Sequence, residues 1–361
     1  FVIQPVDGYG TPDMIRSIIR NEKPCMIWFM TDPRFWGWLW QMEDEIRSLV
    51  PMVYYHVWDN HPAPIYNKGW YQSSDTIACI SKVTEEVVRE VVPDHKDICY
   101  LPHTVDTSVF KKIEDKEEIK KRRAEGFNTL DNANERVIFF WNNRNARRKQ
   151  SGSLIYWFKA FLDEVGHDKA TLLMHTDPKD VHGQDLEYII HHLGLSNGQV
   201  FLSRQKVDPE HLSVMYNIAD CTISVSDAEG FGLATLESLA CETPIIVTMT
   251  GSLQEQVTDG ENWFGIGLEP TSKAIIGSQE IPFIYEDRLS EEVVVDALKK
   301  MYNMTKEQRE KLGSAGREHV LNNYSPEQYA EQWEELFDRV VEKHGSWDTR
   351  KGYKAWELIE V

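Results

Sequence analysis

The sequence predicts an α/β protein made of two doubly wound domains that face each other across a cleft. The length of 361 residues suggests two domains, because single domains commonly have roughly 100–200 residues. Short apolar runs alternate with helical stretches on both sides of a highly charged stretch, residues 111–135. Continuous apolar runs are typical of strands buried on both faces, so this order predicts two parallel sheets covered by helices.

The first domain, residues 1–110, is expected to contain short buried strands separated by helices. Its candidate strands are residues 1–3, 25–30, 52–55, 76–80 and 98–101, and its candidate helices are residues 12–20, 35–50 and 84–91. Residues 111–135 carry many charges of both signs, which is the composition of a solvated linker helix. We therefore expect this stretch to link the two domains.

The second domain, residues 136–325, resumes the alternation of strands and helices. Its candidate strands lie near residues 137–141, 171–174, 200–202, 221–225 and 244–247, and its candidate helices near 151–165, 184–193, 208–218, 233–241, 290–303 and 306–323. The last segment, residues 326–361, begins with a helix and is expected to pack back on the first domain. Parallel sheets bind ligands at the carboxyl ends of their strands, so we expect a site in the cleft.

The composition excludes several classes of protein. The net charge of -19 argues against bulk binding to nucleic acid or to an anionic membrane, because both are polyanions. No apolar run approaches the roughly 18 residues of a membrane span. The five cysteines are scattered singly, mostly inside apolar runs, which indicates reduced core thiols of a cytoplasmic protein and neither disulfides nor a zinc site.

The most informative stretch, residues 226–246, places a glycine-bracketed turn between a strand and a helix. Gly230 and Gly232 allow backbone conformations and close approaches that other residues cannot make. A helix that begins near residue 233 presents free amides and a partial positive charge, which suit a phosphate group. Glu229 on the turn and Glu237 in the helix lie on the same side, where they can accept hydrogen bonds from sugar hydroxyls.

The string Glu229-Gly230-Phe231-Gly232, followed by Glu237, resembles the E-G-F-G-x-x-x-x-E signature of the retaining GT-B glycosyltransferases of family 4 (GT4, glycosyl transferases group 1). Three further stretches occur in the order of that family. Residues 101–110 resemble P-N-G-V-D…F, and Arg144 and Lys149 match G-R-x-x-x-x-K-G, with Asn143 and Gln150 in place of the glycines. The third stretch contains Gly251, Glu255 and Gly260 of G-G-x-x-E-x-x-x-x-G.

The resemblance covers about residues 76–345 and implies the GT-B fold, in which both domains are Rossmann-like. The segment at residues 101–110 closes the first domain far earlier than in a full-length member of the family. We therefore expect the first domain to be shortened, or its opening strands and glycine-rich loop to be absent.

The resemblance assigns the diphosphate of a nucleotide-sugar donor to Arg144 and Lys149, so no metal and no other cofactor is expected. Their neighbours Arg147 and Arg148 are expected to face solvent. The other donor-binding residues that the resemblance implies are Arg204 at the base or phosphate, Glu229 at the sugar hydroxyls, Gly230, Phe231, Gly232 and Leu233 at the phosphate and sugar, and Glu237 at the ribose. The donor is expected to be of the UDP or GDP type.

His56 follows the candidate strand at residues 52–55, where the family often has a histidine that faces the transferred sugar. We therefore expect it to be catalytic, together with Arg144, Lys149 and Glu229. Possible contacts to the sugar or the acceptor are Asp59, His103 and His175. Six of the twelve tryptophans lie in the first seventy residues, where they either pack in the core or form an acceptor surface.

The expected function is a retaining glycosyltransferase, of the hexosyl or pentosyl type, that uses front-face attack assisted by the leaving phosphate. The acceptor stays open, because a saccharide, a lipid, a protein or a modified nucleic acid would all fit the sequence. Two alternatives share the fold: a sugar-nucleotide epimerase, which needs no acceptor, and a non-catalytic relative that binds a carbohydrate or a partner protein. The intact glutamate and Arg144–Lys149 sets argue against the non-catalytic relative.

Overall fold

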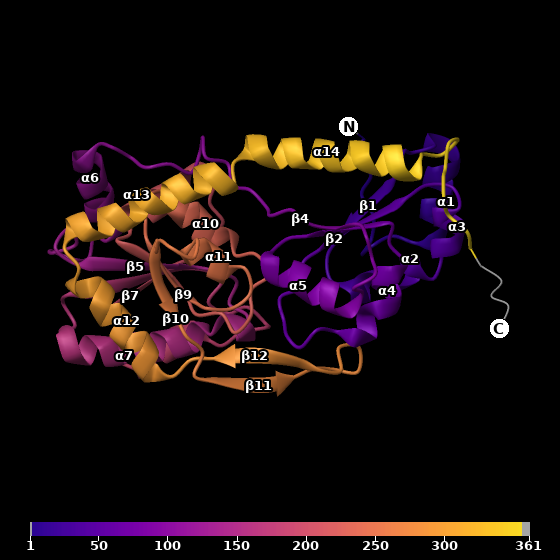
Figure 1. Cartoon of the computed structure of the whole chain (residues 1–361). Coiled ribbons are helices and arrows are strands. Elements are labelled where there is room, and N and C mark those ends of the chain that lie inside the picture. Colours follow the sequence, from indigo (N-terminus) through magenta and orange to yellow (C-terminus); the bar gives the residue numbers. More distant parts are fainter. Residues whose placement is uncertain (1, 356–361) are drawn as a thin grey trace. The chain divides into compact units, whose positions relative to one another are not determined.

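The structure, a computed structural model, describes residues 2–355 and divides into two compact units (Figure 1). The first unit comprises the chain up to His103, the segment Ile275–Tyr285, and the chain from Glu327 onward. The second unit comprises Thr104–Ala274 and Glu286–Pro326. The sequence had assigned residues 275–285 to the second domain, and their place in the first unit was not foreseen.

The first unit contains a four-stranded parallel sheet whose strands lie in chain order, β1-β2-β3-β4. Its strands are β1 (Ile27–Met30), β2 (Met52–His56), β3 (Thr76–Cys79) and β4 (Ile98–Tyr100). Its α-helices are α1 (Pro12–Glu22), α2 (Gly37–Trp40), α3 (Glu43–Arg47), α4 (Lys68–Gln72), α5 (Lys82–Val91) and α14 (Pro326–His344), and two 3-10 turns span Pro33–Trp36 and Ile65–Asn67. The strand order does not reverse, so the doubly wound order is found only in the second unit.

A sheet wound in one direction has its crossover helices on one face, because such connections are right-handed. Here Phe29 and Tyr54 face those helices and share one buried cluster with Trp40. The opposite face is covered by the C-terminal helix. Trp333 of α14 packs edge-on against Trp28 and Tyr55, with ring centroids 5.7 and 5.0 Å apart.

The second unit contains a six-stranded parallel sheet in the order β10-β9-β8-β5-β6-β7. Its strands are β5 (Val137–Asn142), β6 (Ala170–His175), β7 (Val200–Ser203), β8 (Cys221–Ser224), β9 (Ile245–Thr248) and β10 (Gly265–Leu268). The chain runs from β5 outward to β7 and then returns to the other side of β5 with β8. The neighbouring strands β5 and β8 therefore form a topological switch point, where sheets of this kind bind ligands.

Helices cover both faces of this second sheet. They are α6 (Lys116–Gly126), α7 (Ser151–Val165), α8 (Leu186–His192), α9 (Pro209–Ile218), α10 (Leu233–Ala240), α11 (Leu253–Val257), α12 (Glu291–Asn303) and α13 (Lys306–Asn323). One buried cluster joins Phe139 of β5 to Phe158 of α7 and Leu298 of α12. Side-chain caps at Asp208 and Thr305 satisfy the first free amides of α9 and α13, which is why these helices begin there.

The stretch expected to be a solvated linker belongs to the second unit. Its helix α6 buries no residue, as the mixed charges predict. Arg123 nevertheless anchors it, because its Nη2 donates to Asp220 Oδ2 at 2.8 Å and its Nε donates to the carbonyl of Ile218 at 2.8 Å. Residues 111–135 are therefore held against the second sheet and are not a free connection.

Three local expectations were wrong. Residues 35–50 do not form one helix, because the backbone leaves the helical conformation at Met42 and divides the stretch into α2 and α3. No strand includes Val2 and Ile3, which are exposed, and Phe1 lies outside the described residues. Cys25 is exposed, so the cysteines are not all core thiols.

Two further features were not expected from the sequence. Strands β11 (Ser272–Ile276) and β12 (Ile284–Arg288) pair into a two-stranded sheet. In the first unit, the amide of Tyr285 donates to the carbonyl of His61 at 2.6 Å, and Asn60 Nδ2 donates to the carbonyl of Tyr285 at 2.8 Å.

Among the helices within residues 2–355, none combines the length and the apolar character needed to cross a bilayer.

Asp75, at the start of β3, joins the C-terminal segment to the first sheet. Its carboxylate accepts from Arg350 Nη2 at 2.8 Å, from Arg47 Nε at 3.2 Å and from the amide of Met52 at 2.9 Å. All three side chains of this ionic cluster are largely buried, with Asp75 only 4% exposed. Removing one member of a buried ionic cluster leaves the other charges without compensation.

We therefore expect Asp75→Ala to lower the free energy of unfolding by about 3–5 kcal/mol. Urea unfolding followed by tryptophan fluorescence measures this change. The matched control is Asp13→Ala, which removes a carboxylate that is 95% exposed and also pairs with an arginine. Equal midpoints for the two variants would show that the Asp75 cluster does not stabilise the first unit.

Candidate active site

A group of charged side chains lies in the loops that follow β5 and β8 in the second unit. These loops leave the sheet on its carboxyl edge, next to the switch point between β5 and β8. The first loop contains a short 3-10 turn, Arg147–Lys149, and the second contains the glycine turn before α10. The topology therefore brings the two predicted donor-binding motifs to one place.

Lys149 and Glu229 form a buried ion pair between these two loops, in which Lys149 Nζ donates to Glu229 Oε2. The side chains are only 9% and 10% exposed. Burial by itself raises the pKa of Glu229, but the nearby charges of Lys149 and Arg148 outweigh it, so the pKa is lowered. Glu229 is consequently a carboxylate at neutral pH, although it is buried.

The neighbours of Lys149 are partly exposed, and both also make contacts within the site. Arg148 Nη1 donates to the carbonyl of Ala228 at 2.5 Å and lies 3.9 Å from Glu229 Oε1. Arg147 donates to both carboxylate oxygens of Glu286, at 2.9 and 2.6 Å. Both arginines remain partly exposed, so they form a cationic rim around the buried pair.

Asp227 connects the two loops and was missed by the sequence analysis. Its buried carboxylate accepts from Gln150 Nε2 at 2.7 Å and pairs with Arg288 of β12. Its backbone amide donates to the carbonyl of Arg148 at 2.8 Å. The aspartate that precedes the glutamate signature thus holds the cationic loop against the glycine turn.

The start of α10 is built to face an anion. Gly232 is its N-cap residue with φ +81°, a conformation that favours glycine, and it provides no side-chain cap. Leu233, the first residue of the helix, is 43% exposed. Free amides at an uncapped helix start carry a partial positive charge, so this end of α10 suits a phosphate.

The loop after β9 supports the glycine turn from behind. Gly251 has φ +49°, and a Cβ added there would lie 2.0 Å from the carbonyl oxygen of Glu229. The carbonyl of Phe231 accepts from Gln256 Nε2 at 2.6 Å and from the hydroxyl of Ser252. Phe231 therefore uses its carbonyl to fix the turn, and its ring is buried.

Glu237 lies on α10 and joins β5 through a chain of hydrogen bonds. Asn142 Nδ2 donates to the hydroxyl of Tyr216 at 2.8 Å, and that hydroxyl donates to Glu237 Oε2 at 2.7 Å. Burial raises the pKa of Glu237 to about 7, although the hydrogen bond from Tyr216 acts in the opposite direction. This carboxyl group therefore titrates near neutral pH.

Three further predicted residues lie at the ends of β5, β6 and β7 but do not join the buried pair. Arg144 is 61% exposed and makes a two-pronged ion pair with Asp180, at 2.6 and 3.2 Å. Arg204 is also exposed and pairs with Glu187. His175 Nδ1 lies 2.9 Å from the hydroxyl of Ser203, and burial lowers the pKa of this histidine.

The three predicted residues of the first unit differ in how far they are buried. His56 is fully buried, its Nε2 lies 2.8 Å from the hydroxyl of Tyr71, and burial lowers its pKa to about 3. It is neutral and packed among aromatic rings, and its role toward a sugar stays a prediction. His103 stacks on Tyr329 with centroids 5.4 Å apart, and Asp59 is half-buried. Within residues 2–355, no group of three His, Cys, Asp or Glu side chains is arranged to hold a metal.

In the comparison with known protein families, the match falls mainly in the second unit. Residues 179–319 match the family model described as Glycosyl transferases group 1, and this region contains the glycine turn, Glu229 and Glu237. The N-acetyl-alpha-D-glucosaminyl L-malate synthase of Bacillus anthracis is 22% identical over 270 residues. That alignment covers 75% of this chain but only 61% of the relative, so the chain spans less than two thirds of its length.

Two solved structures match nearly the whole chain. The sucrose-phosphate synthase of Thermosynechococcus elongatus gives a TM-score of 0.69 at 19% identity, over 92% of this chain and 77% of that one. HepE of Anabaena, in complex with UDP and glucose, gives 0.68 at 13% identity, over 91% and 82%. The chain therefore has the α/β fold with parallel sheets found in GT-B glycosyltransferases, as the sequence predicts.

The close approach of Gly251 to Glu229 yields a test of the site. We expect Gly251→Ala to destabilise the protein more than Gly260→Ala, because the new methyl group collides with the Glu229 backbone. Gly260 is a matched control, since it also has positive φ (+100°) but has open space around its Cβ position. Differential scanning calorimetry compares the two melting temperatures. Equal losses would mean that backbone strain alone matters at Gly251.

Proposed function

We propose that this chain is a retaining glycosyltransferase of family GT4 that transfers a sugar from a nucleotide-diphosphate sugar to an acceptor hydroxyl. The main observation that supports this proposal is the buried Lys149–Glu229 pair beside the uncapped start of α10. A lysine, a helix start and a charged carboxylate at one switch point suit a ligand that combines a phosphate with hydroxyl groups. The family match over residues 179–319 and the fold support this assignment.

In this proposal the diphosphate binds between Lys149 and the first amides of α10. Arg148 already lies near Glu229, and Arg144, which is 61% exposed, would have to turn from Asp180 to reach the phosphates. Glu229 stays charged because of its cationic neighbours, so it accepts hydrogen bonds from hydroxyls of the transferred sugar.

The transfer step breaks the bond between the anomeric carbon and the diphosphate oxygen and forms a bond from that carbon to the acceptor oxygen. The acceptor attacks on the face that the diphosphate leaves, so the anomeric configuration is retained. The acceptor proton passes to an oxygen of the leaving phosphate. Lys149, Arg148 and the amides of α10 stabilise the charge that develops there, without a metal or another cofactor.

The nucleotide is proposed to be UDP, because HepE was solved with UDP and with UDP-glucose. In this proposal Glu237 accepts hydrogen bonds from the ribose hydroxyls. A panel of UDP-, GDP- and ADP-sugars in a thermal-shift assay tests this, since a bound ligand raises the melting temperature. Mass analysis of the products with added acceptors then separates transfer from isomerisation of the donor, which an epimerase would catalyse. If no sugar nucleotide stabilises the protein, the proposal fails.

Removing Lys149 tests the role of the buried pair. We expect Lys149→Ala to lower the turnover number by about 100-fold or more, because one preorganised cation for the leaving group is lost. The control is Lys159→Ala on α7, whose lysine pairs with Asp163 outside the site and whose loss should leave turnover unchanged.

A second variant separates a loss of catalysis from a loss of the fold. Lys149→Met/Glu229→Gln removes both charges, so no charge is left buried alone. We expect this protein to melt near the wild-type temperature and to be inactive. A folded double variant with near-normal turnover would show that the pair does not serve catalysis.

The titration of Glu237 predicts a pH dependence of donor binding. Its pKa of about 7 means that it is a carboxylate above pH 7 and is protonated below it. A carboxylate accepts from both ribose hydroxyls, so we expect the dissociation constant for the sugar nucleotide to rise as pH falls from 8 to 6. Calorimetric titration measures this. In Glu237→Gln, which cannot titrate there, binding should be weak and independent of pH, and an unchanged slope would contradict the assignment.

A further inference from the structure

A cavity of about 190 Å³ lies at the opposite edge of the second sheet. Asp220, which directly precedes β8, and Pro244, which directly precedes β9, both line it. It therefore lies at the amino ends of the same strands whose carboxyl ends carry the candidate active site. The segment before α6 and the start of α13 complete its wall.

The lining of this cavity is cationic, although the protein as a whole has a net charge of -19. Its basic residues are Lys112, Lys116, Lys120, Arg123, Lys306 and Arg309, and its acidic residues are Glu114, Asp220, Glu242 and Glu310. Some of these charges compensate each other, as in the pair of Lys112 with Glu242 at 2.8 Å. The lining side chains alone leave an excess of two positive charges, and Glu117, outside the lining, compensates one of them by pairing with Lys120 at 2.7 Å. The remaining excess favours an anionic ligand.

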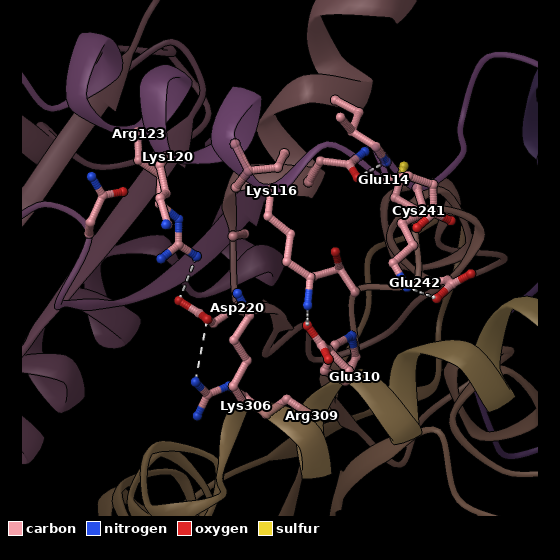
Figure 2. A pocket seen from close by; sticks show the side chains of 18 residues that line it. Glu114, Lys116, Lys120, Arg123, Asp220, Cys241, Glu242, Lys306, Arg309 and Glu310 are labelled. Carbon is pink, nitrogen blue, oxygen red and sulfur yellow. Dashed lines mark hydrogen bonds and ion pairs between the residues drawn. The ribbon is translucent and has the colours of Figure 1, made fainter.

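One cause of this excess is that the single carboxylate of Asp220 pairs with two guanidinium groups. Figure 2 shows its carboxylate between Arg123, at 2.8 Å, and Arg309, at 3.4 Å. Both arginine side chains are 12% exposed. The Nε of Arg309 is buried and has no hydrogen-bond acceptor. Its Nη1 donates to the carbonyl of Met304 at 2.6 Å, which holds this guanidinium in the cavity wall.

Two helices also begin at this cavity with a lysine. Lys116 is the first residue of α6, and Lys306 is the first residue of α13. Figure 2 shows Lys116 reaching toward Glu310 of α13, and the two charged atoms are 3.9 Å apart. Side chains already cap both helix starts, Asp115 for α6 and Thr305 for α13. An anion in the cavity would therefore be attracted mainly by the two lysine ammonium groups.

We propose that this cavity binds the phosphate group of a small phosphorylated molecule, independently of the donor site. Lys116 and Lys306 contact the phosphate from the two helix starts, and the charge of Arg309 in the wall adds to the attraction. Ile113, Ile119 and Pro244 line the remaining space, which receives the organic part of the ligand. A charge-assisted hydrogen bond is stronger than a neutral one, so two lysines account for most of the affinity.

Equilibrium dialysis of the full chain, at constant ionic strength, tests this with three probes: radiolabelled inorganic phosphate, glycerol 3-phosphate and uncharged glycerol. We expect both phosphates to bind, glycerol 3-phosphate more tightly, and glycerol not to bind. Lys116→Ala/Lys306→Ala should weaken phosphate binding by at least about tenfold. The fold should persist in this double variant, because both positions lie on helix surfaces. Circular dichroism and the melting temperature check this.

Two controls make the outcome decisive. Lys121→Ala/Lys311→Ala removes the same charge from the same two helices at exposed positions outside the cavity, and it should keep wild-type binding. Lys149→Ala removes the proposed donor phosphate site and should still bind phosphate at the cavity. The proposal is overturned if Lys149→Ala abolishes all phosphate binding, if both double variants bind equally, or if inorganic phosphate binds and glycerol 3-phosphate does not.

Discussion

The buried ion pair between Lys149 and Glu229 is the interaction on which the site in the second unit depends. Each charge is costly to bury alone, and each is tolerated because the other faces it. The pair joins loops that are 80 residues apart in sequence, so it forms only when β5 and β8 become neighbours. The position of the charges therefore follows from the strand order of the second sheet.

The surrounding contacts restrict how that pair can be placed. Gly251 lets one loop press against the Glu229 backbone, and Asp227 holds the cationic loop from the other side. The result is a locally positive edge in a protein with a net charge of -19. The same sheet carries a second cationic region at its amino edge, around Asp220. In each region the acidic side chains compensate only part of the positive charge. The two regions are separated by the length of the strands.

Much of this arrangement could be predicted from the sequence, because it depends on local pattern. Continuous apolar runs indicated the parallel strands, and the glycine turn before α10 was recognised from Gly230 and Gly232. What could not be predicted depends on tertiary contacts. Gln150, which stands where the family pattern has a glycine, adopts φ +55°, and its side chain binds Asp227, a contact that spacing alone does not reveal. His56 follows the expected strand, yet neighbouring rings enclose it, and no local signal distinguishes a buried histidine from an exposed one.

In the proposed complex, Lys149, Glu229 and the start of α10 together bind the diphosphate and sugar of a nucleotide sugar. A crystal structure of the protein with UDP-glucose decides whether they do. We expect a phosphate oxygen within hydrogen-bond distance of Lys149 Nζ and of an amide at the start of α10, with a sugar hydroxyl donating to Glu229. A nucleotide sugar bound elsewhere, with the Lys149–Glu229 pair untouched, would contradict it.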